Sequence, residues 1–322
     1  MTALMEAGPF RLSVVIPVYN GAKTIGPLVG RLLAELRASY ALEIVLVEDG
    51  SADDSAAVCR ALADQHPEVL FVGLARNFGE HNAVMAGLRR ATGEALVTMD
   101  DDFQNPPQEV ARLVEKLRAG FDVVFAHYER KQHSPFRNAG SWFNNAVATA
   151  MLDKPYDLYL SSFKAMNRFL VDEITSYRGP FPYIDGLVLR TTRHWATETV
   201  AHEARAVGRS NYTLRRLVRL WLAMFTNFSV LPLRVASITG FACAAVGIVA
   251  AIAFGIERID NPDLPLGWAS VIVTVLVVSG VQLVAIGTIG EYLGRLFLSS
   301  NGTPQFVVRE QMARDERRDG EK

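Results

Sequence analysis

The sequence predicts an α/β protein in which a parallel, doubly wound sheet precedes a membrane-associated region. From residue 12 to residue 126, short apolar runs alternate with stretches of helical periodicity, which is typical of a parallel sheet flanked by helices. After residue 230 the chain becomes strongly apolar, and this part supplies most of the positive mean hydropathy of +0.15. A length of 322 residues leaves room for two such structural units.

Short apolar segments that end in turn-forming or polar residues are expected to form the strands of the sheet. They are Leu12–Ile16, Glu43–Val47, Val69–Leu74, Ala95–Met99 and Asp122–Ala126. The stretches between them have the apolar spacing of amphipathic helices. These helices are expected at residues 25–36, 53–65, 81–90 and 107–119, the last of them started by Asn105 and two prolines.

Polar residues follow three of these strands at the point where each strand ends. The segments are Pro17–Asn20, Glu48–Ser51 and Asp100–Asp102. Ligands bind at the carboxyl ends of strands in open α/β sheets, so these groups are expected to line one site. On an extended segment Asp100 and Asp102 point the same way and can reach one hard cation such as Mg²⁺ or Mn²⁺. The alternative is an acidic turn that caps the next helix.

Several classes of function lose support from what the sequence lacks. It contains neither the G-x-G-x-x-G fingerprint nor a Walker A loop, and its net charge of -1 gives no case for nucleic-acid binding. Cys59 and Cys243 fall in segments of different character, so no disulfide is predicted and a reducing compartment is expected. Leu12–Val18 is too short for a signal peptide and contains Pro17, so we expect a cytoplasmic soluble part.

Four motifs in this order resemble those of the family-two inverting glycosyltransferases. The motifs are Val14–Asn20, Glu48–Ser51, Arg76–Gly79 and Asp100–Pro107. The resemblance is to the polyprenyl-phosphate branch, which includes dolichyl-phosphate mannose synthase and the bacterial undecaprenyl-phosphate glucosyl and aminoarabinosyl transferases. It extends from about Leu12 to about Val308 and implies a GT-A nucleotide-sugar fold, which is Rossmann-like.

The resemblance also implies roles for individual residues. Asp100 and Asp102 would hold Mg²⁺ or Mn²⁺ on the donor diphosphate, while Asp49 would contact the nucleoside together with Pro17 and Tyr19. Further nucleotide-binding positions implied by the motifs are Asn20, Glu48, Arg76, Asp100 and Asp101. The family has aspartate where this chain has Glu48, which keeps the charge, and Asp101 occupies a spacer position behind the metal ligands.

The general base is less clearly marked. The family has an acid within a Ser-Gly-Phe-Arg-like stretch, whereas this chain has Ser161 and Ser162 there, with Asp157 nearby at a shifted spacing. Asp157 is therefore either the base or a surface acid, and Asp185 is a second candidate. An acceptor phosphate is already ionised near neutral pH and needs little help from a base. His81 is expected to pack or to cap a helix, with a role in the site as the alternative.

Residues 202–212 resemble the family's phosphate-binding segment. Arg205 and Ser210 would contact phosphates, because a guanidinium can bind phosphate in a bidentate manner. Asn211 replaces a lysine often seen there, and Arg209 is an extra cation that compensates for it. Arg205, Arg209, Ser210 and Arg215 are therefore the residues expected to bind the phosphates and the acceptor. The alternative is that the arginines are solvated surface charges. The expected catalytic residues are Asp157, Asp102 and Arg205.

The C-terminal third has the pattern of a membrane anchor. Residues 213–231 combine arginines with apolar and aromatic residues at helical spacing, which is typical of a membrane-surface helix. Val235–Ile256 and Leu264–Gly290 are long and apolar enough to be two spans, and the positive-inside rule places both termini in the cytoplasm. The charged stretch Arg309–Lys322 is typical of a disordered tail. The expected domains are a GT-A domain at 1–212, an amphipathic helix at 213–231, a transmembrane hairpin at 232–298 and a cytosolic tail at 299–322.

These expectations combine into a multi-pass enzyme of the bacterial inner membrane. It would transfer a sugar from a nucleotide diphosphate, with UDP favoured over GDP, to undecaprenyl phosphate, and glycines in the second span would permit self-association. One alternative is a processive polysaccharide synthase, although the Gln-x-x-Arg-Trp motif of that class is missing. The other alternative is a catalytically weak membrane scaffold of a glycan pathway.

Overall fold

The computed structural model describes residues 9–128, 158–201, 231–260 and 267–312. The chain divides into two compact units. The first consists of Met1–Asn211 together with Pro304–Lys322, and the second is Tyr212–Thr303. The final segment of the chain therefore belongs to the same unit as the N-terminal sheet, although the apolar helices separate the two in sequence.

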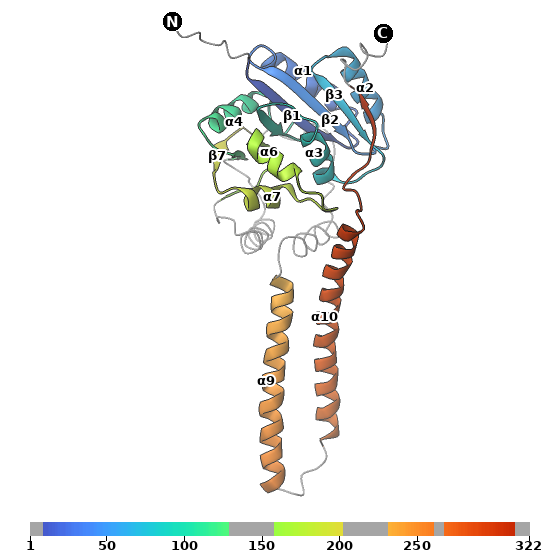
Figure 1. The fold of residues 1–322 in the computed structure, drawn as a ribbon, viewed down its shortest axis with the longest axis vertical. Coiled ribbons are helices and arrows are strands. Elements are labelled where there is room, and N and C mark those ends of the chain that lie inside the picture. Colours follow the sequence, from blue (N-terminus) through green and yellow to red (C-terminus); the bar gives the residue numbers. More distant parts are fainter. Residues whose placement is uncertain (1–8, 129–157, 202–230, 261–266, 313–322) are drawn as a thin grey trace. The chain divides into compact units, whose positions relative to one another are not determined.

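The first unit is built on an eight-stranded sheet with the order β7-β5-β6-β4-β1-β2-β3-β8. Its strands are β1 (Arg11–Val18), β2 (Ala41–Glu48), β3 (Val69–Leu74), β4 (Ala95–Thr98), β5 (Val123–His127), β6 (Lys164–Asn167), β7 (Trp195–Thr199) and β8 (Val308–Met312). The central strands β4, β1, β2 and β3 are parallel, as the alternating pattern predicted. Their carboxyl ends therefore meet at one edge of the sheet (Figure 1).

Three strands were not predicted, and two of them, β6 and β8, make the sheet mixed. β6 runs antiparallel between β4 and β5, so β5 is not the neighbour of β4, while β7 lies parallel to β5. β8 pairs antiparallel with β3 at the other edge. The expected disordered tail is therefore wrong for the residues up to Met312. These short strands escape sequence reasoning because pairing with the neighbouring strand, rather than a long apolar pattern, holds them in place.

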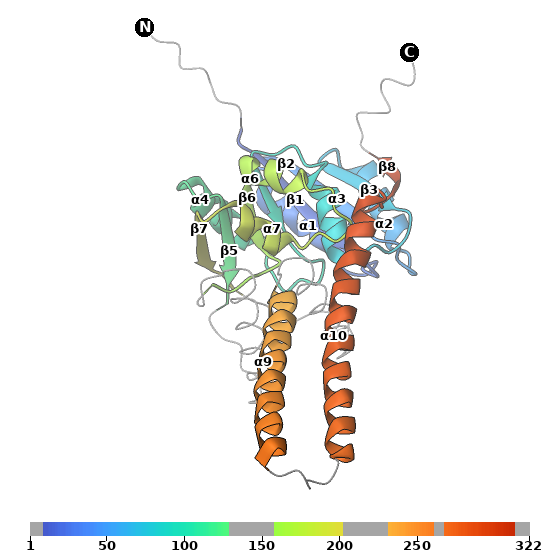
Figure 2. The same cartoon turned by 60° about the horizontal axis from the view of Figure 1, so that its bottom comes forward.

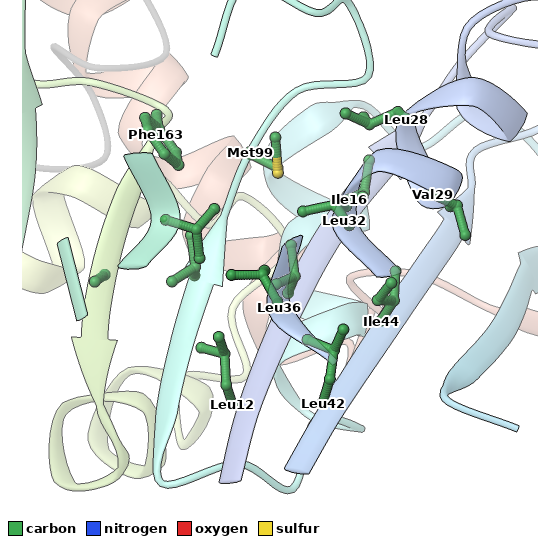
Figure 3. Close-up of a cluster of buried hydrophobic side chains, with 14 of the residues drawn as sticks. Leu12, Ile16, Leu28, Val29, Leu32, Leu36, Leu42, Ile44, Met99 and Phe163 are labelled. Carbon is green, nitrogen blue, oxygen red and sulfur yellow. The ribbon is translucent and has the colours of Figure 1, made fainter. Parts of the chain in front are cut away.

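Helices cover both faces of the sheet (Figures 1 and 2). They are α1 (Ile25–Leu36), α2 (Ser55–Gln65), α3 (Glu80–Leu88), α4 (Gln108–Arg118), α6 (Arg168–Thr175) and α7 (Ile184–Thr191). The apolar stripes of α1, α2 and α4 share one core with alternate residues of the strands, while α3 packs on β1 and β2. Figure 3 shows Leu32 of α1 beside Ile16 of β1, with Met99 at the same height in the view as Phe163. Met99 is 1% exposed and so anchors the acidic segment that follows it.

The second unit contains α9 (Leu231–Asp260) and α10 (Trp268–Ser300), which contact each other. Within the described residues, the stretch Val277–Ser300 is long and apolar enough to cross a membrane, and Ala236–Val249 is a shorter apolar stretch. The helix α10 continues past the predicted end of the span at Gly290, because leucines and a phenylalanine extend its apolar character. Large apolar side chains stand exposed along both helices, more than a water-soluble surface normally presents.

The segment that follows α10 is fixed to the first unit by a buried glutamine. The Gln305 side chain donates from Nε2 to the carbonyl oxygens of Tyr177 at 2.9 Å and Gly179 at 2.6 Å. Its Oε1 accepts a 2.7 Å hydrogen bond from Arg89, whose guanidinium also lies over the ring of Phe306. Because every polar atom of this buried amide is bonded, the residues that lead into β8 have a defined path.

Candidate active site

The loops after β1 and β2 are joined by hydrogen bonds at the carboxyl edge of the sheet. Asp49 N–H donates to the carbonyl oxygen of Val18 at 3.0 Å. Asn20 has a positive φ of 56°; its N–H donates to Ser51 Oγ and its Oδ1 accepts from Ala52 N–H, both at 3.0 Å. Asn20 thus holds the two loops together, while the neighbouring residue Tyr19 is 46% exposed.

Asp49 connects β2 to the loop that follows β3. Its carboxylate accepts hydrogen bonds from the N–H groups of Phe78 at 2.7 Å and Gly79 at 2.8 Å. Burial raises the pKa of Asp49 to about 6, with a further rise from Glu48, and these two hydrogen bonds oppose the shift. Arg76 is exposed in this loop, and its guanidinium lies over the Phe78 ring. The predicted nucleotide-binding residues Asp49 and Arg76 are therefore brought together.

Gly50 allows that loop to pack closely, and its replacement provides a first test. Gly50 has a φ of +64°, and a Cβ there would lie 2.4 Å from Asn77 N. We expect Gly50→Ala to lower the free energy of unfolding by about 1–3 kcal/mol, because a left-handed conformation and a backbone collision both oppose the methyl group. Urea denaturation of the purified protein measures this change.

Gly30→Ala is the matched control. Gly30 lies within α1, and nothing lies within 4 Å of a Cβ added there. We expect the free energy of unfolding of this variant to rise by about 0.5–1 kcal/mol, since alanine is a better helix former than glycine. Equal effects of the two alanines would contradict the account of Gly50.

Glu48 is 5% exposed and lies at the end of β2 beside Asp49. One of its carboxylate oxygens accepts a hydrogen bond from Ser51 N–H. The longer side chain that replaces the family's aspartate thus still closes the turn after β2. Pro17, by contrast, is only partly buried on β1, next to the exposed Tyr19.

The acidic segment after β4 lies beside these loops. Asp100 Oδ2 accepts a 2.7 Å hydrogen bond from Ser162 Oγ, and Asp102 Oδ1 accepts a 3.1 Å bond from Gln104 N–H. Asp101 lies against the loop after β1, because a Cβ on Gly21 would sit 1.9 Å from Asp101 Oδ2. A side chain at position 21 would therefore have to displace the Asp101 carboxylate from its present position.

Burial raises the pKa of Asp100 to about 7. The nearby carboxylates of Glu80 and Asp102 raise it further, whereas the Ser162 hydrogen bond and Lys164 oppose the rise. The segment is therefore a place where negative charges crowd together in a partly desolvated setting. A cation bound there would relieve this repulsion, so the donor set fits a hard divalent ion.

A buried ion pair lies behind the acids. Lys164 Nζ contacts Asp185 Oδ1, and the Lys164 side chain is only 4% exposed. Lys164 also lies over the Phe125 ring, 5.5 Å from its centroid. Asp185 is thus the counterion of Lys164, which argues against its use as a general base. His81 packs edge-on against Tyr183 with the ring centroids 5.1 Å apart, and burial lowers its pKa to about 4, in keeping with a packing role.

Ser162 and Lys164 are the site residues that sequence reasoning missed. Ser162 stands where the family has an acid, and its hydroxyl donates to Asp100. Both residues reach the acids because β6 pairs with β4, a pairing that no local signal reveals. The predicted residues Asp157, Arg205, Arg209, Ser210 and Arg215, and the predicted amphipathic helix, lie outside the described residues.

Among the described residues, no group of three or more acidic, histidine or cysteine side chains is arranged to hold a metal by itself. Asp100 and Asp102 could nevertheless share a divalent cation with substrate phosphates, which is the usual way in which Mg²⁺ is held. The protein would then contribute carboxylate oxygens, and the substrate would contribute the rest of the coordination.

The arrangement of the sheet and its helices resembles that of a solved protein. The chain is similar to the crystal structure of glucosyl-3-phosphoglycerate synthase from Mycobacterium tuberculosis in complex with phosphoglyceric acid. The TM-score is 0.50 with 20% sequence identity, over 68% of this chain and 80% of the other. This likeness shows the GT-A type of mixed α/β fold.

The family follows from the sequence comparisons. The model of glycosyl transferase family 2 matches residues 13–175. The undecaprenyl-phosphate 4-deoxy-4-formamido-L-arabinose transferase of Pseudomonas fluorescens (strain SBW25) is 35% identical over 304 residues, which are 92% of this chain and 88% of that protein. The protein of the same name from Yersinia pestis (strain Pestoides F) is 32% identical, over 92% of each chain. The chain belongs to glycosyl transferase family 2, and it is a glycosyltransferase.

Proposed function

We propose that the protein transfers a sugar from a nucleotide diphosphate donor, with UDP favoured, to undecaprenyl phosphate at the cytosolic face of a bacterial inner membrane. The observation that carries the proposal is the extent of the match to the undecaprenyl-phosphate transferases. It covers 92% of the chain and therefore includes both the acidic site and the apolar helices. The name of these relatives makes 4-deoxy-4-formamido-L-arabinose the first sugar to test.

The chemistry requires few protein groups. A phosphate oxygen of the acceptor attacks the anomeric carbon as the bond from that carbon to the nucleotide diphosphate breaks, with inversion of configuration. The acceptor is already anionic, so positioning and charge neutralisation carry most of the rate. The protein supplies loops that hold the nucleotide, built around Asp49 and Asn20, and acids that face the diphosphate, Asp100 and Asp102. Bound Mg²⁺ or Mn²⁺ would supply the positive charge that the diphosphate leaving group needs.

The membrane part suits an acceptor whose hydrocarbon tail lies in lipid and whose phosphate lies at the interface. The proposed topology has two spans, in α9 and α10, with both termini in the cytoplasm. Arg234 before the first apolar stretch and Arg295 near the end of the second support it under the positive-inside rule. The exposed side chains Phe241 and Leu283, at 77% and 69%, would face lipid.

Cation binding should depend on pH because of Asp100. With its pKa at about 7, this carboxyl holds a proton below pH 7, and the proton must leave before a cation can bind. We expect the affinity for Mn²⁺ in the presence of UDP to fall by up to about tenfold for each pH unit below 7. Electron paramagnetic resonance of free Mn²⁺ measures this, with circular dichroism to verify the fold. A flat profile between pH 5.5 and 7 would contradict the role given to Asp100.

The reaction itself is tested by nucleotide release. Detergent-solubilised protein is incubated with undecaprenyl phosphate and pooled UDP- or GDP-sugars, with and without Mn²⁺ or Mg²⁺. Release that requires both the cation and the lipid phosphate supports the proposal, and separating the pool identifies the sugar. Release without lipid phosphate, accompanied by polymer, would instead show a processive synthase. Absence of release, while a control transferase is active in the same lipid, would refute the proposal in favour of a scaffold role.

A further inference from the structure

A cavity of about 340 Å³ lies between the ends of β2 and β3 and the C-terminal strand β8. Residues with predicted nucleotide-binding roles, Glu48 and Arg76, line one part of it. Arg309 and Glu310 of β8 line another part, although they are more than 200 residues away in sequence. The cavity therefore extends the candidate donor site from the ends of β2 and β3 towards β8, the outermost strand on that side of the sheet.

The pairing of β8 with β3 brings these two side chains to the cavity. Gly73 is opposite Glu310 and Leu74 is opposite Val308, so Arg309 is the extra residue of a bulge. A bulge redirects a side chain and is common beside active sites. A Cβ added at Gly73 would lie 3.0 Å from the Phe71 ring and 3.7 Å from Glu310 Cβ, so the glycine lets both of these cavity-lining side chains pack against β3 beside the bulge.

Hydrogen bonds and ring contacts hold the charged side chains around the cavity in place. Arg60 Nε donates to both carboxylate oxygens of Glu310, at 3.0 Å and 2.9 Å, and the Arg60 guanidinium lies over the Phe71 ring. Arg309 donates to the carbonyl oxygen of Ala75 at 3.2 Å. The wall thus presents arginine donors beside carboxylate acceptors in set positions. A nucleoside base and ribose carry both donors and acceptors, so this is the chemistry that recognises them.

We infer that β8 forms one wall of the nucleoside end of the donor site, with Arg309 and Glu310 as affinity-determining residues for the nucleoside diphosphate. This inference rests on the proposed function, because it assigns the nucleoside of the same donor to this cavity. It also gives the residues after the apolar helices a role in donor binding. Glu48 and Arg76 would then face β8 across the bound nucleoside.

The test is nucleotide binding by Arg309→Gln and Glu310→Gln in the full-length detergent-solubilised protein. Isothermal titration calorimetry with UDP, GDP, CDP and dTDP gives the dissociation constants. For the nucleotide that the wild type binds, we expect a rise of about tenfold to 100-fold in each variant, since each loses charge-assisted hydrogen bonds. The donor KM should rise in parallel, while kcat and the acceptor KM stay within about twofold of wild type.

Gln311→Ala is the matched control, because Gln311 is the next residue of β8 and does not line the cavity. Its dissociation constant should remain that of the wild type. Hydrogen exchange gives a second measurement that needs no variant: the bound nucleotide should slow exchange of the amides in residues 306–312. Unchanged binding by both cavity variants would overturn the inference, as would equal losses in all three variants, which would mean a purely structural strand.

The wild-type protein separates this inference from the proposed function. If the wild type binds nucleotide and transfers sugar but the cavity variants behave like it, only the inference fails. If the wild type binds none of the four nucleotides, the proposed function fails and the inference fails with it.

Discussion

Replacing Asp102 with asparagine is expected to lower the turnover number about 100- to 1,000-fold, because in the proposed function the charge of the acids after β4 holds the cation that neutralises the donor diphosphate. Asparagine keeps the size of the side chain and can still accept the 3.1 Å hydrogen bond from Gln104 N–H. The local turn should therefore survive while the charge is lost. The assay is the release of nucleotide in the presence of undecaprenyl phosphate and Mn²⁺.

A surface acid provides the comparison for Asp102. Asp172 forms an exposed ion pair with Arg168 on α6, and its side chain is 65% exposed. Asp172→Asn removes the same charge and should keep wild-type turnover. If Asp102→Asn retained more than about a tenth of the activity, the assignment of this acid to the diphosphate would be untenable.

Lys164→Met is expected to be the most destabilising of the changes considered, at about 3–5 kcal/mol in the free energy of unfolding. The methionine fits the volume of the lysine but leaves Asp185 buried without its cation. A buried carboxylate without a partner costs far more than the ion pair contributes when both members are present. Chemical denaturation of the detergent-solubilised protein, followed by circular dichroism, measures this loss.

The double variant Lys164→Met/Asp185→Leu distinguishes this explanation from a simple packing defect. Removing both charges should restore most of the stability, because neither member of the ion pair is then left buried without the other. Arg112→Met, which breaks an exposed pair with Glu109 and Glu198, should leave unfolding nearly unchanged. A double variant as unstable as Lys164→Met would show that the ion pair is not the cause.

The sequence was most informative where physical rules act locally. The parallel strands β1 to β4 follow from apolar runs that end in polar turns, and the acids after Met99 stand out because a buried strand rarely ends in three carboxylates. The approach of Asp49 to the loop after β3 also follows from strand ends that meet at one edge. These predictions needed only the spacing of apolar residues, the composition of the segments and the topology of parallel sheets.

The remaining parts of the site depend on contacts between distant segments. Lys164 meets Asp185, and Ser162 meets Asp100, only once β6 has been inserted beside β4. A four-residue strand gives no periodic signal, and its antiparallel direction breaks the alternating rule that predicted its neighbours. Charge was misleading in the C-terminal segment: the charged residues from Arg309 onwards predict a disordered tail, but Glu310 pairs with Arg60 of α2.

The attachment of β8 to β3 has a consequence for the order in which the chain matures. A ribosome completes β3 long before β8, so the nascent sheet carries an open edge while the apolar helices α9 and α10 are being synthesised. The edge strand arrives only after both helices have left the ribosome. The sheet can therefore be completed only in a chain whose apolar region has been synthesised in full. A protein truncated within the helices would keep its acids but remain unfinished at that edge.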